Sequence, residues 1–305
     1  MQGVEDRELK MTKYLIKDGV GIIPKGTTRI EGCGLYGFQG FPTKGMLDNE
    51  IGSFEGCTSL EKIVIPDSVK EIGYYSFSKC RSLSSIVIPD SVTMIGYRAF
   101  ESCSSLTDVF IPESVIDIDR LVFEGCTGLT KITVAKGNKV YDSRDNCNAI
   151  IKTSTNTLII GCQNTIIPNT VKRIGDWAFC GCATLTNIVI PDSVKNIRRE
   201  AFCGCSGLTS ITIPSSVKVI GENAFKGCKG LNSIVLPDSV EVLGRGAFLF
   251  CENLTQITIP KSVTQFGKGA FYGCTSLKAI NVPVNKVKYY KQLIPSDMHG
   301  LLMEL

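Results

Sequence analysis

Hydrophobic residues recur along this chain at fixed positions of a 23-residue unit. Self-similarity at a constant period is the signature of a solenoid, in which each unit forms one coil that stacks on the next. In the unit that opens at Pro66, the apolar positions are Val69, Ile72, Phe77, Leu83, Ile86 and Ile88. Further units open at Pro89, Pro112, Pro168, Pro191, Pro214, Pro237 and Pro260.

Each unit has the same predicted internal order. Ile86-Val87-Ile88 is a short β-branched run that a proline follows, which predicts a strand ended by that proline. A second short extended piece leads to a glycine such as Gly96, which indicates either a positive φ or a close backbone approach. A short helical turn is expected around A-F-x-G-C. Stacked coils would align the apolar columns into one core and pair the strands in a parallel ladder.

One stretch shows the unit in full: residues 185–205 read L-T-N-I-V-I-P-D-S-V-K-N-I-R-R-E-A-F-C-G-C. This pattern resembles the 23-residue repeat of the BspA-like leucine-rich-repeat family, and the resemblance extends from about Ile23 to Pro283. It implies a β-rich, right-handed leucine-rich-repeat solenoid of about ten coils, with short helical turns and a parallel strand ladder. The resemblance also implies a location on bacterial or protist surfaces, and a role in adhesion or protein binding.

Three segments depart from the repeat and set the expected domain plan. Residues 1–23 would form an N-terminal cap that includes a hairpin around Lys17-Asp18-Gly19, and the solenoid would occupy residues 24–283. Residues 135–167 form a longer, irregular unit whose two apolar runs predict a β-hairpin around residues 153–156 that bends the array or divides it into two stacks. Residues 284–305 would form a C-terminal cap, with Asn285 capping a short helix that Pro295 ends and with His299 in a solvated tail.

The first coil carries an insertion at residues 34–50 with three aromatic side chains, Tyr36, Phe38 and Phe41. Such a loop either contacts a partner or folds back over the open end of the solenoid. Residues 32–37 also spell G-x-G-x-x-G, but a dinucleotide loop is rejected because no helix pattern follows and no βαβ unit surrounds the motif.

Charge and composition argue against some classes of function but do not identify one. The formal net charge is +4, with both signs dispersed, which is too weak and diffuse to indicate nucleic-acid binding. The sequence contains no apolar run of membrane-spanning length. Residues 1–10 contain no apolar signal-peptide core, so we expect either a cytosolic protein or one whose signal has been removed. The family resemblance favours the second alternative and an extracellular or cell-surface location.

The 14 cysteines separate into groups once they are placed on the repeat. One column is expected to hold buried, reduced thiols that pack as small hydrophobic residues, since the other ligands of a zinc array are missing. Its members are Cys57, Cys80, Cys103, Cys126, Cys182, Cys205, Cys228, Cys251 and Cys274.

Cys180 and Cys203 lie outside that column, in two C-G-C pairs that are one coil apart. Their own column is mostly polar, which predicts that it faces solvent. Stacked neighbours lie near the Cα separation that a disulfide tolerates. A Cys180–Cys203 disulfide, a metal site that uses both C-G-C pairs, and two free thiols are therefore all open.

The residues offer no catalytic constellation. The single histidine, His299, leaves no Cys-His or Ser-His pair. Oxygen-bearing residues at 142–148 fail the EF-hand template, because Cys147 stands where the glycine belongs, and they indicate an Asx-rich turn instead. We expect no enzyme activity, no cofactor and no metal.

The candidate binding surface is the outward side of the strands, because alternate residues of a strand point away from the core. A flat, mildly polar sheet suits a broad protein contact better than a small ligand. The candidates before the irregular unit are Lys62, Val64, Ser85, Val87, Asp108, Phe110, Lys131 and Thr133. We therefore expect a noncatalytic, cell-surface or secreted module for protein binding or adhesion, acting through this face or the inserted loop. The alternatives are a structural spacer without its own ligand, and a thiol or metal protein built on the C-G-C pairs.

Overall fold

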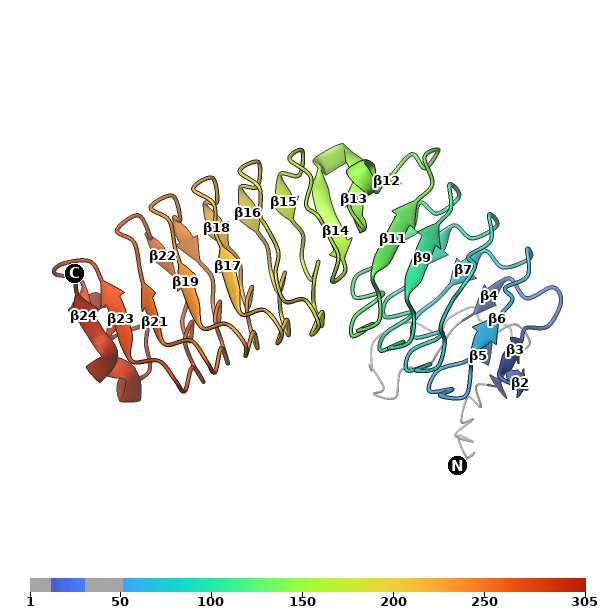
Figure 1. Ribbon diagram of the computed structural model, residues 1–305, viewed down its shortest axis with the longest axis horizontal. Helices are drawn as coiled ribbons and strands as arrows, with labels where there is room; N and C mark the ends of the chain where they lie inside the picture. Colours follow the sequence, from blue (N-terminus) through green and yellow to red (C-terminus); the bar gives the residue numbers. More distant parts are fainter. Residues whose placement is uncertain (1–11, 31–51) are drawn as a thin grey trace, which may run out of the picture.

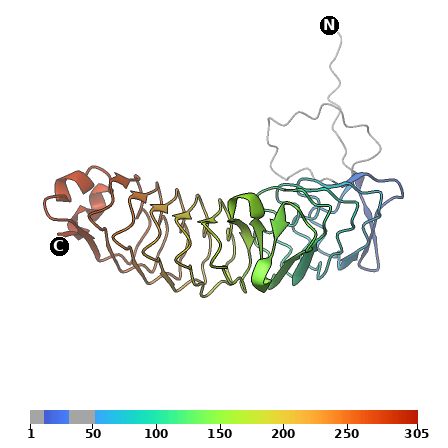
Figure 2. The same ribbon diagram turned by 90° about the horizontal axis from the view of Figure 1, so that it is seen from above.

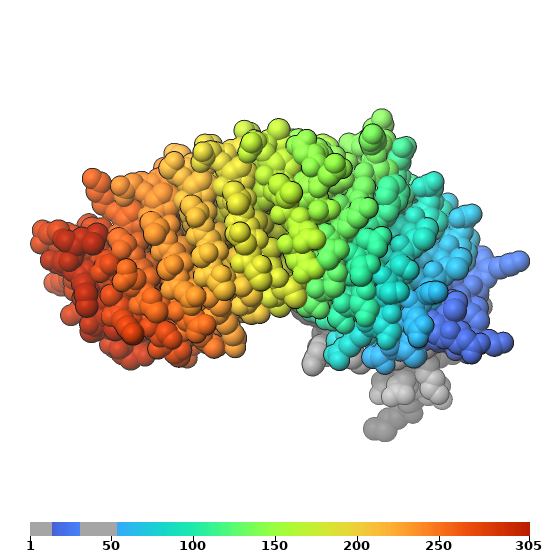
Figure 3. Space-filling view, viewed as in Figure 1, coloured from blue at the N-terminus to red at the C-terminus, as the bar shows by residue number. Residues whose placement is uncertain are grey.

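The computed structural model describes residues 12–30 and 52–305 of the chain. It is an elongated, bowed stack of coils, with the N-terminal coils at one end and the C-terminal coils at the other (Figures 1 and 2). The solenoid predicted from the 23-residue period is confirmed, and very little of the described chain is helical. The surface view shows the coils as parallel layers that follow one another without a break (Figure 3).

The first strand ladder is built from the I-x-I runs. Its parallel register repeats every 23 residues, as in the pairing of Ser210 with Ser233 and of Phe110 with Thr133. We call the outward side of this ladder the strand face. Its strands are β2 (Leu15–Lys17), β3 (Val20–Ile22), β6 (Lys62–Ile63), β9 (Asp108–Ile111), β11 (Lys131–Val134), β17 (Ser210–Thr212), β19 (Ser233–Val235), β21 (Gln256–Thr258), β23 (Ala279–Val282) and β24 (Leu302–Glu304).

A second ladder is formed by the extended piece that follows P-x-S-V. Its first sheet joins β4 (Arg29–Ile30), β7 (Glu71–Ile72), β8 (Met94–Ile95) and β10 (Asp117–Ile118). Its second sheet joins β12 (Tyr141–Asp142), β13 (Ala149–Lys152), β14 (Thr157–Gly161), β15 (Arg173–Ile174), β16 (Asn196–Ile197), β18 (Val219–Ile220), β20 (Val242–Leu243) and β22 (Gln265–Phe266). A separate short pair joins β1 (Thr12–Lys13) to β5 (Gly52–Ser53).

Identical spacing stacks identical side chains in the core. Phe179, Phe202, Phe225, Phe248 and Phe271 form a column of nearly parallel rings whose neighbouring centroids lie 5.0 to 6.0 Å apart. A matching column before the irregular unit contains Phe54, Phe77, Phe100 and Phe123. Such offset or stacked aromatic contacts add to the burial of apolar area that holds neighbouring coils together.

Polar columns also bond from coil to coil. The serine of P-x-S-V donates to the carbonyl of a valine in the preceding coil, as Ser216 does to Val194 at 2.7 Å. The cysteine thiols do the same: Cys228 donates to the carbonyl of Phe202 at 3.1 Å, 26 residues earlier. The prediction of buried, reduced column thiols is thus confirmed for Cys80, Cys103, Cys205, Cys228, Cys251 and Cys274, while Cys57, Cys126 and Cys182 are half-buried.

The turns of the coil follow from close packing. Around A-F-x-x-C the chain makes linked turns, in which Cys80 N–H donates to Phe77 O and Leu83 N–H donates to Cys80 O, each at 3.1 Å. The glycine column reflects close backbone approach, which was one of the two predicted reasons. A Cβ on Gly244 would lie 2.4 Å from the carbonyl carbon of Gly221 in the preceding coil.

The irregular unit divides the core into two clusters, as predicted. Its hairpin, β13 and β14, is antiparallel, and a short 3₁₀ helix at Thr153–Thr155 joins the two strands. Ile150 and Ile160 belong to the N-terminal cluster, whereas Ile151 and Leu158 belong to the C-terminal one. The hairpin therefore separates the two clusters and contributes apolar side chains to both of them. A 3₁₀ turn at Arg144–Asn146 precedes it, where Asp142 Oδ1 accepts from the Arg144 N–H, in agreement with the predicted Asx turn.

The C-terminal segment corrects two predictions. The helix is the single turn α1 (Val287–Tyr290), and Asn285 does not cap it: its φ is +63° and its N–H donates to Glu304 Oε1. His299 is not in a solvated tail, because a 3₁₀ helix (Ser296–Leu301) places its Nε2 3.0 Å from Ile294 O. The strand β24 then pairs with β23 and extends the first ladder. Polar composition suggested a free tail, but Tyr290, Ile294 and Met298 bury this segment against the last coil.

Candidate functional site

The eight strand-face residues predicted from the sequence lie on the outer side of the first ladder. Along β9 and β11, outward residues alternate with the buried residues Val109, Ile111, Ile132 and Val134. Seven of the eight candidates are exposed and Thr133 is half-buried. The period of two along each strand therefore accounts for their outward placement.

An apolar row crosses the N-terminal part of the strand face. Val64 and Val87 bridge neighbouring strands and are 75% and 78% exposed, and Phe110 one coil further on is 51% exposed. The row continues in the other direction through two residues that the sequence reasoning left out. Ile22 lies one residue past the pairing of Gly21 with Ile63, and Leu15 pairs with Ile22. Five neighbouring extended segments thus each place an exposed, large apolar side chain in this row.

A sequence signal for Ile22 was available. Gly21-Ile22-Ile23-Pro24 ends as Ile63-Val64-Ile65-Pro66 does, so β3 could have been aligned as the first strand of the ladder. The predicted hairpin is confirmed, since β2 and β3 are antiparallel, but β3 also pairs in parallel with β6.

The charged candidates lie in the adjacent row, two residues before the apolar row along each strand. Asp108 pairs directly with Lys131, whereas Lys62 lies beside Val20 in a different part of the ladder. The strand face before the hairpin therefore combines a continuous apolar row with isolated charges of both signs. Such a surface can bury apolar area against another protein while its charges set the register of the contact.

The inserted-loop candidates Tyr36, Phe38 and Phe41 lie outside the described residues, as does the G-x-G-x-x-G run at 32–37. After the hairpin, the strand face carries Ile166, Val189 and Val235 at 69 to 76% exposure. Threonine and asparagine interrupt this second row at Thr212, Thr258 and Asn281.

Cys180 and Cys203 occupy a half-buried column, which corrects the prediction that this column faces solvent. Glu55 and Ser78 of the same column are buried, because the corner packs each side chain against its counterpart in the next coil. Cys180 and Cys203 are free thiols in contact with each other. Hydrogen bonding between them lowers the pKa of Cys203 and raises that of Cys180.

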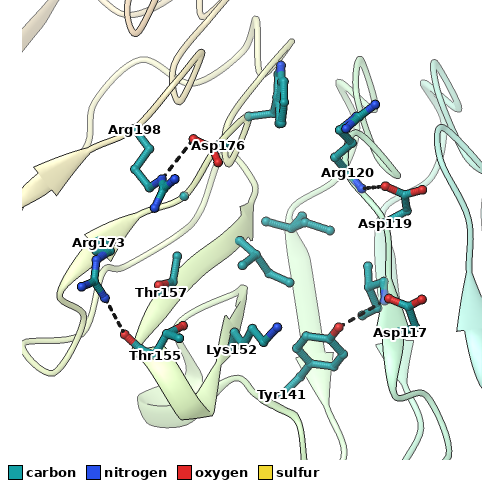
Figure 4. A pocket seen from close by; sticks show the side chains of 15 residues that line it. Asp117, Asp119, Arg120, Tyr141, Lys152, Thr155, Thr157, Arg173, Asp176 and Arg198 are labelled. Atoms are coloured by element: carbon teal, nitrogen blue, oxygen red, sulfur yellow. Dashed lines mark hydrogen bonds and ion pairs between the residues drawn. The ribbon is translucent and has the colours of Figure 1, made fainter. Parts of the chain in front are cut away.

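A cleft of about 710 Å³ opens between the two stacks on the second ladder, where the hairpin separates β10 from β15 (Figure 4). Asp117 and Asp119 line it from the N-terminal stack, and Lys152 and Arg173 line it from the hairpin and the C-terminal stack. The Ile118 N–H donates to the buried Tyr141 hydroxyl at 3.1 Å, which ties β10 to the irregular unit across the cleft.

A row of aromatic and guanidinium groups lies beside this cleft, which two of its members, Arg120 and Trp177, line. The Arg120 guanidinium lies 5.3 Å from the Tyr97 ring and 5.2 Å from the Trp177 ring, and Arg199 lies 5.5 Å from Trp177. Cation–π contacts of this kind join a residue of the N-terminal stack to one of the C-terminal stack. The cleft is therefore the joint between the stacks. The sequence pattern does not indicate this cleft.

The described part of the chain contains neither a metal-binding cluster nor a membrane-spanning helix. Within residues 12–30 and 52–305, no three His, Cys, Asp or Glu side chains gather closely enough to hold a metal ion, so the C-G-C pairs do not form the four-thiolate site considered above. No helix in these ranges is both long and apolar enough to cross a membrane.

Comparison with known proteins agrees with the geometry. A family model described as the BspA-type leucine-rich repeat region matches residues 50–157 and 159–278 in six copies. The structure of a leucine-rich cell surface protein from Faecalibacterium prausnitzii is 33% identical, with a TM-score of 0.68. The match covers 80% of this chain and 66% of that chain, so this chain spans just under two thirds of that protein.

More distant structures support the fold alone. A leucine-rich-repeat protein from Eubacterium ventriosum is 23% identical, with a TM-score of 0.51 and coverage of 74% of this chain and 81% of that one. The pneumococcal vaccine antigen PcpA is 19% identical, with a TM-score of 0.55 and coverage of 80% and 66%. Among curated proteins, none matches this chain.

Proposed function

Since the chain belongs to the BspA-type leucine-rich-repeat family, we propose that it is a noncatalytic protein-binding and adhesion module, displayed at a cell surface or secreted. The family relation and the similarity to a leucine-rich cell surface protein from F. prausnitzii support the surface location. The contact surface is the strand face of the N-terminal stack.

The observation that carries this proposal is the apolar row formed by Leu15, Ile22, Val64, Val87 and Phe110. A solenoid needs its inward columns for stability, but nothing in coil stacking requires large apolar groups on the outward side. Contiguous exposed apolar groups with a polar surround mark protein contact surfaces. A flat ladder that spans several coils matches the extended contacts that solenoids make.

A photo-crosslinking experiment tests the contact surface. A benzophenone amino acid is placed at Val87 on the strand face and, as a control, at Lys218, which is also exposed and directly precedes β18 of the second ladder. Each protein is irradiated with intact neighbouring cells. A discrete crosslinked product is expected from position 87 and not from position 218. Phe110→Glu is expected to abolish it, and reversing Lys62 and Lys131 together to weaken it, with the unfolding midpoint unchanged.

Two outcomes contradict the proposal. Equal products from both positions would show nonspecific association, and no product from either would favour the structural-spacer alternative. The surface location is tested separately by mild trypsin treatment of intact producing cells. Release of peptides from 136–167 is expected, and full protection of this segment would place the protein inside.

A further inference from the structure

Cys180 and Cys203 form the one thiol pair of the described residues that combines neighbouring coils, partial exposure and direct contact away from the buried cysteine column. We propose that they are a reversible oxidation site, at which a disulfide oxidant such as glutathione disulfide produces a bond between two coils.

The backbone holds the two residues at a bridging distance. The Phe179 N–H donates to Ala201 O at 2.7 Å, and the Gly181 N–H donates to Cys203 O at 2.8 Å. These bonds lie on both sides of Cys180, so the coils are one strand spacing apart there, about 4.8 Å. That spacing falls within the Cα separation of about 4.4 to 6.8 Å that disulfides show.

The column cysteines are stacked at the same period, but their thiols are hydrogen-bonded to backbone carbonyls. Cys205 and Cys228 are fully buried, and each donates to a phenylalanine carbonyl of the preceding coil at 3.1 Å. Cys103 and Cys126 also contact each other, yet both donate to such carbonyls as well. Burial raises the pKa of the Cys205 thiol. A column thiol would have to break its carbonyl bond and ionise in the core before it could react.

Local charges favour Cys203 as the attacking thiol. Cys203 contacts Cys180 on one side, and Lys226 occupies the same position of the next coil on the other. Both factors stabilise a thiolate on Cys203 and lower its pKa, although burial and nearby carboxylates oppose them. Cys180 lies on the other side of the pair, with its thiol 3.7 Å from Glu124 Oε1 of the N-terminal stack.

The reaction balances in two exchange steps. The Cys203 thiolate attacks one sulfur of glutathione disulfide, whose S–S bond breaks and releases one glutathione thiolate. Cys180 then loses its proton to solvent and attacks the Cys203 sulfur of the mixed disulfide, which releases the second glutathione. Two protein thiols are oxidised by two electrons, and one glutathione disulfide is reduced to two glutathiones.

Oxidation also changes a contact between the two stacks, outside the cleft. In the reduced protein the Cys180 S–H is a donor toward Glu124, and the disulfide has no proton to donate. The bond therefore fixes two coils of the C-terminal stack to each other while it removes one contact to the N-terminal stack. The redox state of the pair is thereby coupled to the contact between the two stacks.

Mass spectrometry of the native full chain tests the proposal. The protein is incubated with excess glutathione disulfide, its free thiols are alkylated, and it is digested with trypsin. Cleavage after Arg173, Lys195, Arg199 and Lys218 gives peptides 174–195 and 200–218, each with two cysteines. The expected product is these two peptides joined by one disulfide, with fragment ions that assign the bond to 180 and 203. Dithiothreitol is expected to separate them.

Cysteine variants show which of the four thiols form the disulfide. Cys180→Ser and Cys203→Ser should each abolish the linked peptide, whereas Cys182→Ala with Cys205→Ala should retain it. If the double variant fails to fold, the fragment ions of the unmodified chain decide the assignment. Alkylation of both Cys180 and Cys203 after oxidation, a bond assigned to 182 and 205, or a stable glutathione adduct without the link would each overturn the proposal.

Discussion

At the scale of single residues, the repeat turns one side-chain contact into a column. Cysteine suits its column because it is small enough for the coil corner and can donate to a carbonyl of the preceding coil, as Cys251 does to Phe225 at 3.1 Å. Alanine would fill similar space but would leave that carbonyl without its donor. This contact explains a large number of cysteines without a disulfide framework.

The charged form of Glu124 destabilises the folded state. Burial raises its pKa, and the ion pair with Arg98 at 2.8 Å offsets this only in part. A carboxyl group with a raised folded pKa contributes stability below its unfolded pKa of about 4.5, and this contribution is lost as the pH rises through the folded pKa. Glu124→Gln should therefore gain stability relative to the unmodified chain between about pH 4 and pH 7.

Urea unfolding at both pH values measures this difference. Glu241→Gln is the matched control, because Glu241 pairs with Lys218 at 2.9 Å on the exposed surface. Its replacement should change stability by less than about 1 kcal/mol at either pH. If the Glu124→Gln variant instead loses stability relative to the unmodified chain as the pH rises, the ion pair with Arg98 contributes more than the burial of the charge costs.

At the scale of elements, the joint between the stacks depends on a few side chains. Arg120 lies between the rings of Tyr97 and Trp177, and Trp177 is the only tryptophan of the chain. Arg120→Ala should cost about 1–2 kcal/mol, since each exposed cation–π contact contributes about 0.5–1 kcal/mol. The emission of Trp177 should shift to the red, because its ring becomes more exposed to water.

Denaturation followed by tryptophan fluorescence measures both effects. Arg245→Ala is the control, since Arg245 forms an exposed ion pair with Glu222 at 3.0 Å and contacts neither ring of the joint. It should cost less than about 1 kcal/mol and leave the emission maximum unchanged. An Arg120→Ala protein with an unshifted spectrum would show that the joint does not depend on this contact.

The features that could be predicted from the sequence are those that the 23-residue period repeats. Val69 and Phe77 could be assigned to the core and Val87 and Phe110 to the outside because stacked coils repeat each environment. The joint could not be predicted, because the Arg120–Trp177 contact crosses the irregular unit and depends on how the hairpin replaces a regular corner. His299 was misplaced for a related reason: composition alone does not show that β24 pairs with β23.

At the scale of the whole molecule, the two core clusters make the chain a pair of stacks joined by a hairpin. A solenoid's stability is close to a sum of coil terms and nearest-neighbour interfaces. Each phenylalanine column ends at the hairpin, so no aromatic stacking continues from Phe123 to Phe179 in the described structure. The interface at the hairpin is therefore the natural place for unfolding to stop, and the two stacks should open in separate steps.

Substitution of one buried ring in each stack tests this. Phe100 and Phe225 are both fully buried and each stacks on two neighbouring rings, so Phe100→Ala and Phe225→Ala should each cost about 3–5 kcal/mol through the cavity they create. Hydrogen exchange followed by mass spectrometry should show faster exchange across 52–134 in the first variant and across 168–283 in the second. Phe250→Ala is the exposed control and should change neither region. Equal acceleration of both regions by either core variant would mean that the hairpin transmits the loss and that the chain unfolds as one unit.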